Sequence, residues 1–132
     1  ALGVGAQVQC FGASGDCQAQ LLDIQPSGAG SIVSAVLRGK TVRFPILQAG
    51  HHWGHNSLAA ILMLEALGLD RDLAITALGQ FEPLAGRGAE RKVTIAGGQF
   101  TLIDESYNAN PISMAAALKT LGARKATGLL TG

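Results

Sequence analysis

The sequence predicts a mixed α/β chain, and three observations support this prediction. Residues 7–47 contain short runs in which apolar and polar side chains alternate, as they do in half-buried strands. The run 50–67 is apolar almost all round, which is typical of a helix in a protein interior. A hairpin pattern then precedes a polar loop and the Ala-rich run 115–118, which favours helix.

Four strands are expected in the first third of the chain. Their expected ranges are 7–11, 17–24, 32–37 and 41–47, separated by Gly-containing turns that predict an antiparallel meander. In the last of them, Val42, Phe44 and Ile46 fall on one face and polar residues on the other, as in a sheet with one wet face. Pro45 lacks the N–H that an interior strand must donate, so we expect an edge position for it.

Two helices should follow these strands. The apolar run 50–67 is expected to be buried on most of its surface and to end at Gly68. Asp70 is a suitable N-cap for a second helix over 71–78, which Gly79 would end.

A new β pattern begins after a connection that contains Pro and Gly, at 81–88. We therefore place a domain boundary there, giving units 1–82 and 83–132. Alternating residues on either side of Gly97-Gly98 predict a hairpin. Its second half, 100–103, is short and apolar, which predicts a buried strand.

The polar stretch from Asp104 to Asn110 is a strand-to-helix loop. Asn110 can cap the following helix and Pro111 suits its first turn. Orphan amides at the helix start, together with side-chain acceptors at the strand end, can bind a ribose, a phosphate or a carboxylate. The acceptors are Asp104, Ser106, Tyr107 and Asn108. The alternative is that Asp and Asn only cap and turn the backbone, and local chemistry favours it.

Composition excludes several classes of protein. The 132 residues carry a formal net charge of +1, and their Lys and Arg residues form no cluster, so a nucleic-acid partner is not expected. No apolar run reaches the roughly 18 residues of a membrane helix, so membrane insertion is not expected either. The start, Ala-Leu-Gly-Val-Gly-Ala, has neither an initiator Met nor a signal-peptide pattern, and we expect a piece of a longer protein. The oligomeric state is left open.

Cys10 and Cys17 are the only cysteines. They lie in a Gly-rich segment and lack the further ligands that a zinc site requires. We expect reduced thiols, as in a cytoplasmic protein.

Three stretches resemble motifs of the Mur ligase family. The run Asp-Glu-Ser-Tyr-Asn-Ala-Asn-Pro at 104–111, followed by Ser-Met-x-Ala-Ala-Leu, is similar to a signature loop of these ligases. Within the family, it is most similar to the loop of the member that joins D-Ala-D-Ala to UDP-N-acetylmuramoyl-tripeptide. The segment 50–60, Gly-x-His-x-x-x-Asn-x-Leu-Ala-Ala, is similar to the family segment that borders the adenine of ATP. Gly86-Arg87 resembles the pair whose arginine reaches the γ-phosphate.

The resemblance implies a fold and a domain arrangement. Residues 1–82 would be the C-terminal half of the central ATP-binding domain, with antiparallel strands and a helix pair. Residues 83–132 would begin the C-terminal domain, which is Rossmann-like in the family.

The resemblance also implies site residues. The residues expected to bind the nucleotide are His52, Asn56, Arg87, Asp104, Tyr107 and Asn108. Those expected near the substrates are Ser106, Asn108 and Asn110, and Arg87 would be the catalytic residue.

Three of these assignments have alternatives. Trp53 stands where many members have an asparagine, and its indole is able to stack on a purine. For Asn56 the alternative is a helix N-cap, and for Arg87 a solvated side chain. A metal site at His51, His52 and His55 is disfavoured, because no carboxylate or Cys follows at ligand spacing.

The implied function is ATP-dependent amide ligation in peptidoglycan precursor synthesis, through an acyl phosphate, with ATP and Mg²⁺. No Gly-x-x-x-x-Gly-Lys-Thr/Ser loop occurs in the sequence, so Mg²⁺ and phosphate ligands are expected upstream and the chain alone should not ligate. Two alternatives stay open. One is a non-catalytic binding module on the same scaffold, and the other is a sister ligase of the Mur or folylpolyglutamate type.

Overall fold

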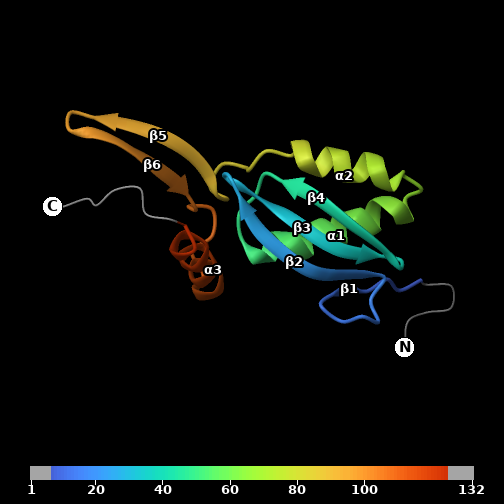
Figure 1. Cartoon of the computed structure of the whole chain (residues 1–132). Coiled ribbons are helices and arrows are strands. Elements are labelled where there is room, and N and C mark those ends of the chain that lie inside the picture. The colour runs from blue at the N-terminus through green and yellow to red at the C-terminus, as the bar shows by residue number, and fades with distance from the viewer. Residues whose placement is uncertain (1–6, 125–132) are drawn as a thin grey trace.

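The computed structural model describes residues 7–124, which form two β-sheets and three helices (Figure 1). In chain order the elements are β1 (Phe11–Gly12), β2 (Ala19–Ser27), β3 (Gly30–Leu37), β4 (Lys40–Ile46), α1 (His51–Ala66), α2 (Arg71–Gln80), β5 (Ala89–Ile95), β6 (Gly98–Asp104) and α3 (Pro111–Gly122). The expected mixed α/β class is confirmed.

The larger sheet has the strand order β1-β2-β3-β4. Strands β2, β3 and β4 form the expected antiparallel meander. The expectation for the first strand, 7–11, is wrong, because β1 covers only Phe11–Gly12 and pairs in parallel with β2. The alternation in β4 is confirmed, because Phe44 and Ile46 are buried and Arg43 and Pro45 are exposed. Since β4 is an edge strand, the predicted edge position of Pro45 is also confirmed.

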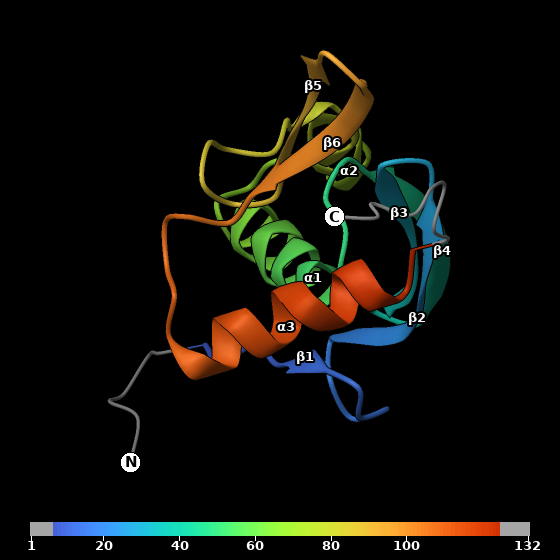
Figure 2. The same ribbon diagram turned by 90° about the vertical axis from the view of Figure 1, so that its left-hand side faces the viewer.

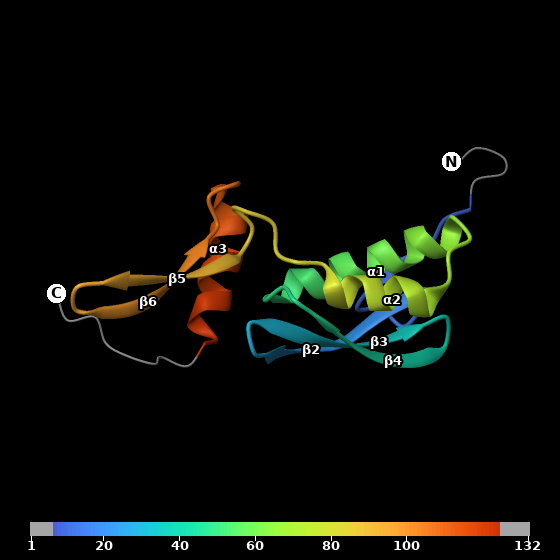
Figure 3. The same ribbon diagram turned by 90° about the horizontal axis from the view of Figure 1, so that it is seen from above.

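Helices α1 and α2 lie side by side on one face of this sheet (Figure 3). Leu58 and Ile61 of α1 are fully buried against Leu37 and Phe44 of the sheet, in one continuous core. Burying a side chain of this size contributes about 1.5–3 kcal/mol to stability. The second helix begins as predicted, since the Asp70 Oδ1 accepts a hydrogen bond of 3.0 Å from the Leu73 N–H.

The expectation that α1 is buried on most of its surface is wrong. Its buried apolar side chains, Leu58, Ile61 and Leu62, share one face of the helix, whereas Met63 is 61% exposed. The sheet and α2 pack against one part of the helix circumference, and α3 comes close to the start of the helix. Because α1 is apolar almost all round, its sequence could not show which of its faces packs against the core.

Strands β5 and β6 form the predicted hairpin, with Val93 opposite Phe100 and the turn just before Gly98. The expectation of a buried strand at 100–103 is wrong, because Phe100 is 37% exposed and only the end of β6 is half-buried. The cause is visible in Figure 1, where the two-stranded ribbon projects from the rest of the chain.

The expectation of free thiols is also wrong, because Cys10 and Cys17 are joined in a disulfide. Pairing of Phe11 with Ala19 folds the intervening segment back on itself and brings the two Cα atoms to 4.7 Å, which suits a disulfide. The cytoplasmic location stays a prediction, as does the boundary between residues 82 and 83. None of the helices in residues 7–124 is long and apolar enough to cross a membrane.

Replacing Leu58 by Ala should lower the free energy of unfolding by about 2–5 kcal/mol, because it leaves a cavity in the core under α1. Leu73→Ala is the matched control, since Leu73 is 62% exposed and its loss should change stability by no more than about 0.5 kcal/mol. Urea unfolding followed by circular dichroism measures both. Equal losses in the two variants would contradict this placement of the core.

Candidate functional site

The loop after β6 is bound to the segment that precedes β5. The Asp104 carboxylate accepts hydrogen bonds of 3.1 Å from the backbone N–H groups of Gly86 and of Ser106, one on each oxygen. The Tyr107 N–H donates to the Gly86 carbonyl at 3.1 Å, and the Gly88 N–H donates to the Asp104 carbonyl at 2.9 Å. Arg87 is therefore held beside the loop by bonds on both of its flanking glycines.

Asp104 is the centre of this arrangement. Hydrogen bonds from the Ser106 side chain and backbone, and then from Gly86, lower the pKa of Asp104 below 3.8, although desolvation opposes them. The carboxylate is thus ionised at neutral pH and accepts from amides of both segments. In this structure it fixes the loop.

The side chain of Arg87 lies over the ring of Tyr107, with its Cζ atom 3.9 Å from the ring centroid. This is cation–π geometry, which contributes about 0.5–1 kcal/mol at an exposed site. Both side chains are exposed, so the guanidinium is oriented by the ring and still accessible from outside.

Asn108 and Asn110 turn the chain into α3. The Asn108 Oδ1 accepts from the Asn110 N–H at 3.1 Å, and the Asn110 Oδ1 accepts from the N–H groups of Ile112 and Ser113 at 3.0 and 2.9 Å. The predicted N-cap at Asn110 is confirmed. These bonds are the ones expected if the asparagines cap and turn the backbone, and a contact of either side chain with a substrate stays a prediction.

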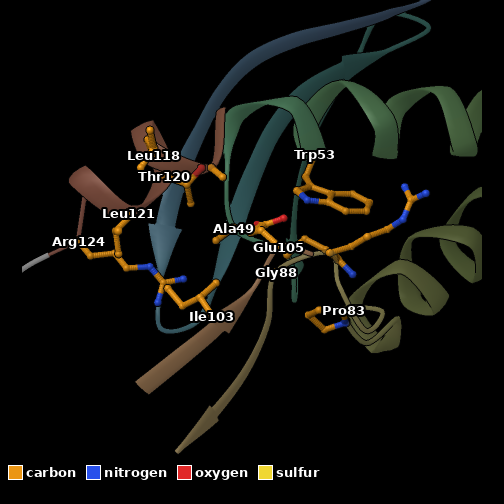
Figure 4. A pocket seen from close by; sticks show the side chains of 13 residues that line it. Ala49, Trp53, Pro83, Gly88, Ile103, Glu105, Leu118, Thr120, Leu121 and Arg124 are labelled. Carbon is orange, nitrogen blue, oxygen red and sulfur yellow. The ribbon is translucent and has the colours of Figure 1, made fainter. Parts of the chain in front are cut away.

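Arg87 lines a cavity of about 120 Å³. Trp53 of α1 and Glu105 of the loop lie in its wall (Figure 4), and residues of α3 complete it. Ligand pockets typically measure about 300–1,000 Å³, so this cavity has room for one ring system and not for a whole nucleotide.

A second, more open hollow of about 1540 Å³ lies between the first turn of α1, the β5–β6 hairpin and α3. Helix α3 crosses beside the start of α1, as Figure 2 shows, and a Cβ atom on Gly50 would lie 2.8 Å from the Thr120 Oγ1. His52 lines this hollow together with His51 and His55.

Comparison with known proteins finds similarity to Mur ligases. No family model matches the chain. The UDP-N-acetylmuramate–L-alanine ligase of Rhodopseudomonas palustris is 32% identical over 126 residues, which cover 89% of this chain and 25% of that enzyme. The crystal structure of MurF from Acinetobacter baumannii superimposes with a TM-score of 0.74 and 25% identity, over 90% of this chain and 25% of that one. The chain is related to the Mur ligase family.

A third similarity supports the fold. The MurF ligase of Thermotoga maritima, solved in complex with ADP, superimposes with a TM-score of 0.68 at 20% identity, over 84% of this chain and 25% of that one. The chain thus spans about a quarter of the length of the Mur ligases that it matches.

The structure brings some of the Mur ligase motifs together and leaves one apart. Arg87 and the loop with Asp104 and Tyr107 form one unit, and Trp53 faces the same cavity as Arg87. Asn56 is exposed on α1 and lines neither hollow. The N-cap alternative for Asn56 is wrong, because α1 begins at His51, which places Asn56 in the second turn.

His52 is placed at the first turn of α1. Desolvation, followed by the neighbouring His51, lowers the pKa of His52 below 6.5, so its imidazole is neutral at pH 7. A neutral imidazole suits hydrogen bonding to a base or sugar better than it suits binding a phosphate.

Mg²⁺ is implied by the Mur ligase relation, and the described residues do not fit it. Among residues 7–124, no group of three or more His, Cys, Asp or Glu side chains is arranged to hold a metal ion. Among these residues, His51, His52 and His55 therefore belong to no such group.

Most residues of the cavity wall were not predicted from the sequence, Gln48 and Glu105 among them. Gln48 lies in no recognisable motif. Glu105 belongs to the predicted loop, but no role was predicted for it, although its side chain lines the cavity. Trp53 could be predicted as a site residue because of its position within the segment that resembles the Mur ligase motif.

Gly86→Ala should disrupt the contact between the two segments. Gly86 has φ +74°, and a Cβ atom there would lie 2.9 Å from the Tyr107 nitrogen. We expect a loss of about 1–2 kcal/mol in unfolding free energy from the backbone conformation alone, and reduced hydrogen-exchange protection of the Tyr107 amide. The matched control is Gly97→Ala, whose Cβ would meet nothing within 4 Å. Unchanged protection of Tyr107 in the first variant would contradict the arrangement.

Proposed function

We propose that this chain is the part of a Mur ligase that holds ATP from its base side, with Trp53, Arg87 and Tyr107 as the contact residues. The observation that carries the proposal is the fixed position of Arg87. The hydrogen bonds on Gly86 and Gly88 and the Tyr107 ring hold Arg87, which lines a cavity that has an indole in its wall.

The chemistry of these groups suits a nucleotide. A guanidinium presents a planar fork of donors that matches phosphoryl oxygens and keeps its charge at every relevant pH. The indole offers a face for a purine, and the volume of the cavity suits one ring system. The base would thus enter the cavity while the phosphates stay outside it, near Arg87.

For the whole enzyme we propose ligation through an acyl phosphate. A carboxylate attacks the γ-phosphate of ATP and ADP leaves, and an amine then attacks the acyl carbon, loses a proton to solvent and displaces phosphate. Arg87 would neutralise charge on the transferring group. Bound Mg²⁺ would supply further neutralisation of the phosphates, and its ligands would lie outside residues 7–124. His52, Asn56, Asp104 and Asn108 remain proposed neighbours of the nucleotide, and Ser106, Asn108 and Asn110 of the substrates.

The proposed reaction is the addition of D-Ala-D-Ala to UDP-N-acetylmuramoyl-tripeptide. The loop Asp-Glu-Ser-Tyr-Asn-Ala-Asn-Pro and the superposition on MurF support this substrate pair. The second candidate is the addition of L-Ala to UDP-N-acetylmuramate, because that is the name of the relative at 32% identity. Both candidates would use the same nucleotide site.

Arg87→Ala should weaken ATP binding by about 10- to 150-fold, the equivalent of charge-assisted hydrogen bonds to the γ-phosphate worth about 1.5–3 kcal/mol. Arg43→Ala is the matched control, since Arg43 is an exposed arginine of β4 that lines neither hollow. Isothermal titration of both variants measures the effect. Equal affinity in the two variants would remove Arg87 from the nucleotide site.

The 132-residue chain alone should not ligate either substrate pair, because its sequence contains no phosphate loop. The protein encoded by the complete reading frame should release phosphate from ATP with the tripeptide and D-Ala-D-Ala. Phosphate release with UDP-N-acetylmuramate and L-Ala would instead identify the second candidate. Turnover by the chain alone would contradict the proposal, and no turnover in any combination would favour a non-catalytic module.

A further inference from the structure

Gln48 is the buried polar side chain in the wall of the 120 Å³ cavity, with an exposed fraction of 4%. It lies between the end of β4 and the start of α1, and it lines the same cavity as Trp53. A buried amide normally has hydrogen-bond partners for both its nitrogen and its oxygen.

The orientation of this amide is fixed by its neighbour. The Gln48 Nε2 donates a hydrogen bond of 2.7 Å to the Phe81 carbonyl, which can only accept, so nitrogen and oxygen cannot be exchanged. The backbone carbonyl of Gln48 is also engaged, since it accepts from the Ser31 Oγ at 3.0 Å. The side-chain Oε1 therefore points away from Phe81 in a defined direction.

No described residue donates a hydrogen bond to this Oε1. Among residues 7–124, every side-chain nitrogen or oxygen that is fully shielded from solvent has a partner, so Oε1 is not fully shielded. Gln48 is among the residues that line the 120 Å³ cavity. It therefore brings to the wall of this cavity an oriented acceptor to which no described residue donates.

We propose that Gln48 selects the nucleobase, its Oε1 accepting a hydrogen bond from the exocyclic amine of adenine. This inference rests on the proposed nucleotide site and adds the group that reads the base. Trp53, half-buried in the same wall, provides a stacking face, which every base can use and which gives no selectivity. The acceptor supplies the selectivity, because hypoxanthine has the shape of adenine and carries a carbonyl oxygen in place of the amine.

The test compares ADP with inosine diphosphate on the unmodified chain, by NMR titration of the Gln48 side-chain amide and the Trp53 indole. ADP should bind about 2- to 12-fold more tightly, the range that one neutral hydrogen bond gives. Equal affinities, or tighter binding of inosine diphosphate, would overturn the role of Gln48 and leave the proposed site standing. If neither nucleotide binds, the proposed function and this inference both fail.

Two variants separate base reading from stacking. Gln48→Leu should reduce the affinity for ADP to that for inosine diphosphate and leave the latter unchanged. Trp53→Leu should weaken both by the same factor, about 5- to 150-fold. Circular dichroism checks the fold, because Gln48→Leu also removes the donor to Phe81. A folded Gln48→Leu variant that still binds ADP more tightly than inosine diphosphate would refute the proposal. If the variant does not fold, the ratio of the two affinities in the unmodified chain is the test.

Discussion

The hydrogen bonds between the Asp104 carboxylate and the amides of Gly86 and Ser106 are the constraint on which the candidate site depends. They join two segments that are 18 residues apart in sequence and set the position of Arg87 relative to the loop. Without them, only the backbone hydrogen bonds of Gly86 and Gly88 would hold Arg87 to the loop. With them, its guanidinium packs on Tyr107, and Arg87 lines the same cavity as Trp53.

Local patterns in the sequence were sufficient to predict most of the helices and strands and two of the helix caps. The alternation in β4, the edge position of Pro45 and the caps at Asp70 and Asn110 depend on neighbouring residues only, and all four predictions are confirmed. Exposure was harder to predict, because it depends on which elements meet in space. An all-apolar pattern gave no indication that the sheet and α2 cover only one part of α1.

For the candidate site, too, the local motifs could be predicted from the sequence and the spatial neighbours of their side chains could not. The motifs located Arg87 and the loop, and the structure brings these together. Motif spacing did not show that Asn56 lies outside both hollows, because the direction of a side chain on α1 depends on where the helix begins. Gln48 was missed since its role arises from a bond to Phe81, 33 residues away. The disulfide likewise depends on the pairing of β1 with β2.

The central claim is that one cavity, beside Arg87 and with Trp53 in its wall, receives the base of a nucleotide. Trp53 is the only tryptophan in the chain, so its fluorescence reports on this cavity alone. Titration with ATP and with adenosine is the most direct test. We expect a saturable change in Trp53 emission with both ligands, at lower concentration for ATP because only ATP offers a γ-phosphate to Arg87. No change in emission at saturating millimolar ATP would contradict this placement of the base.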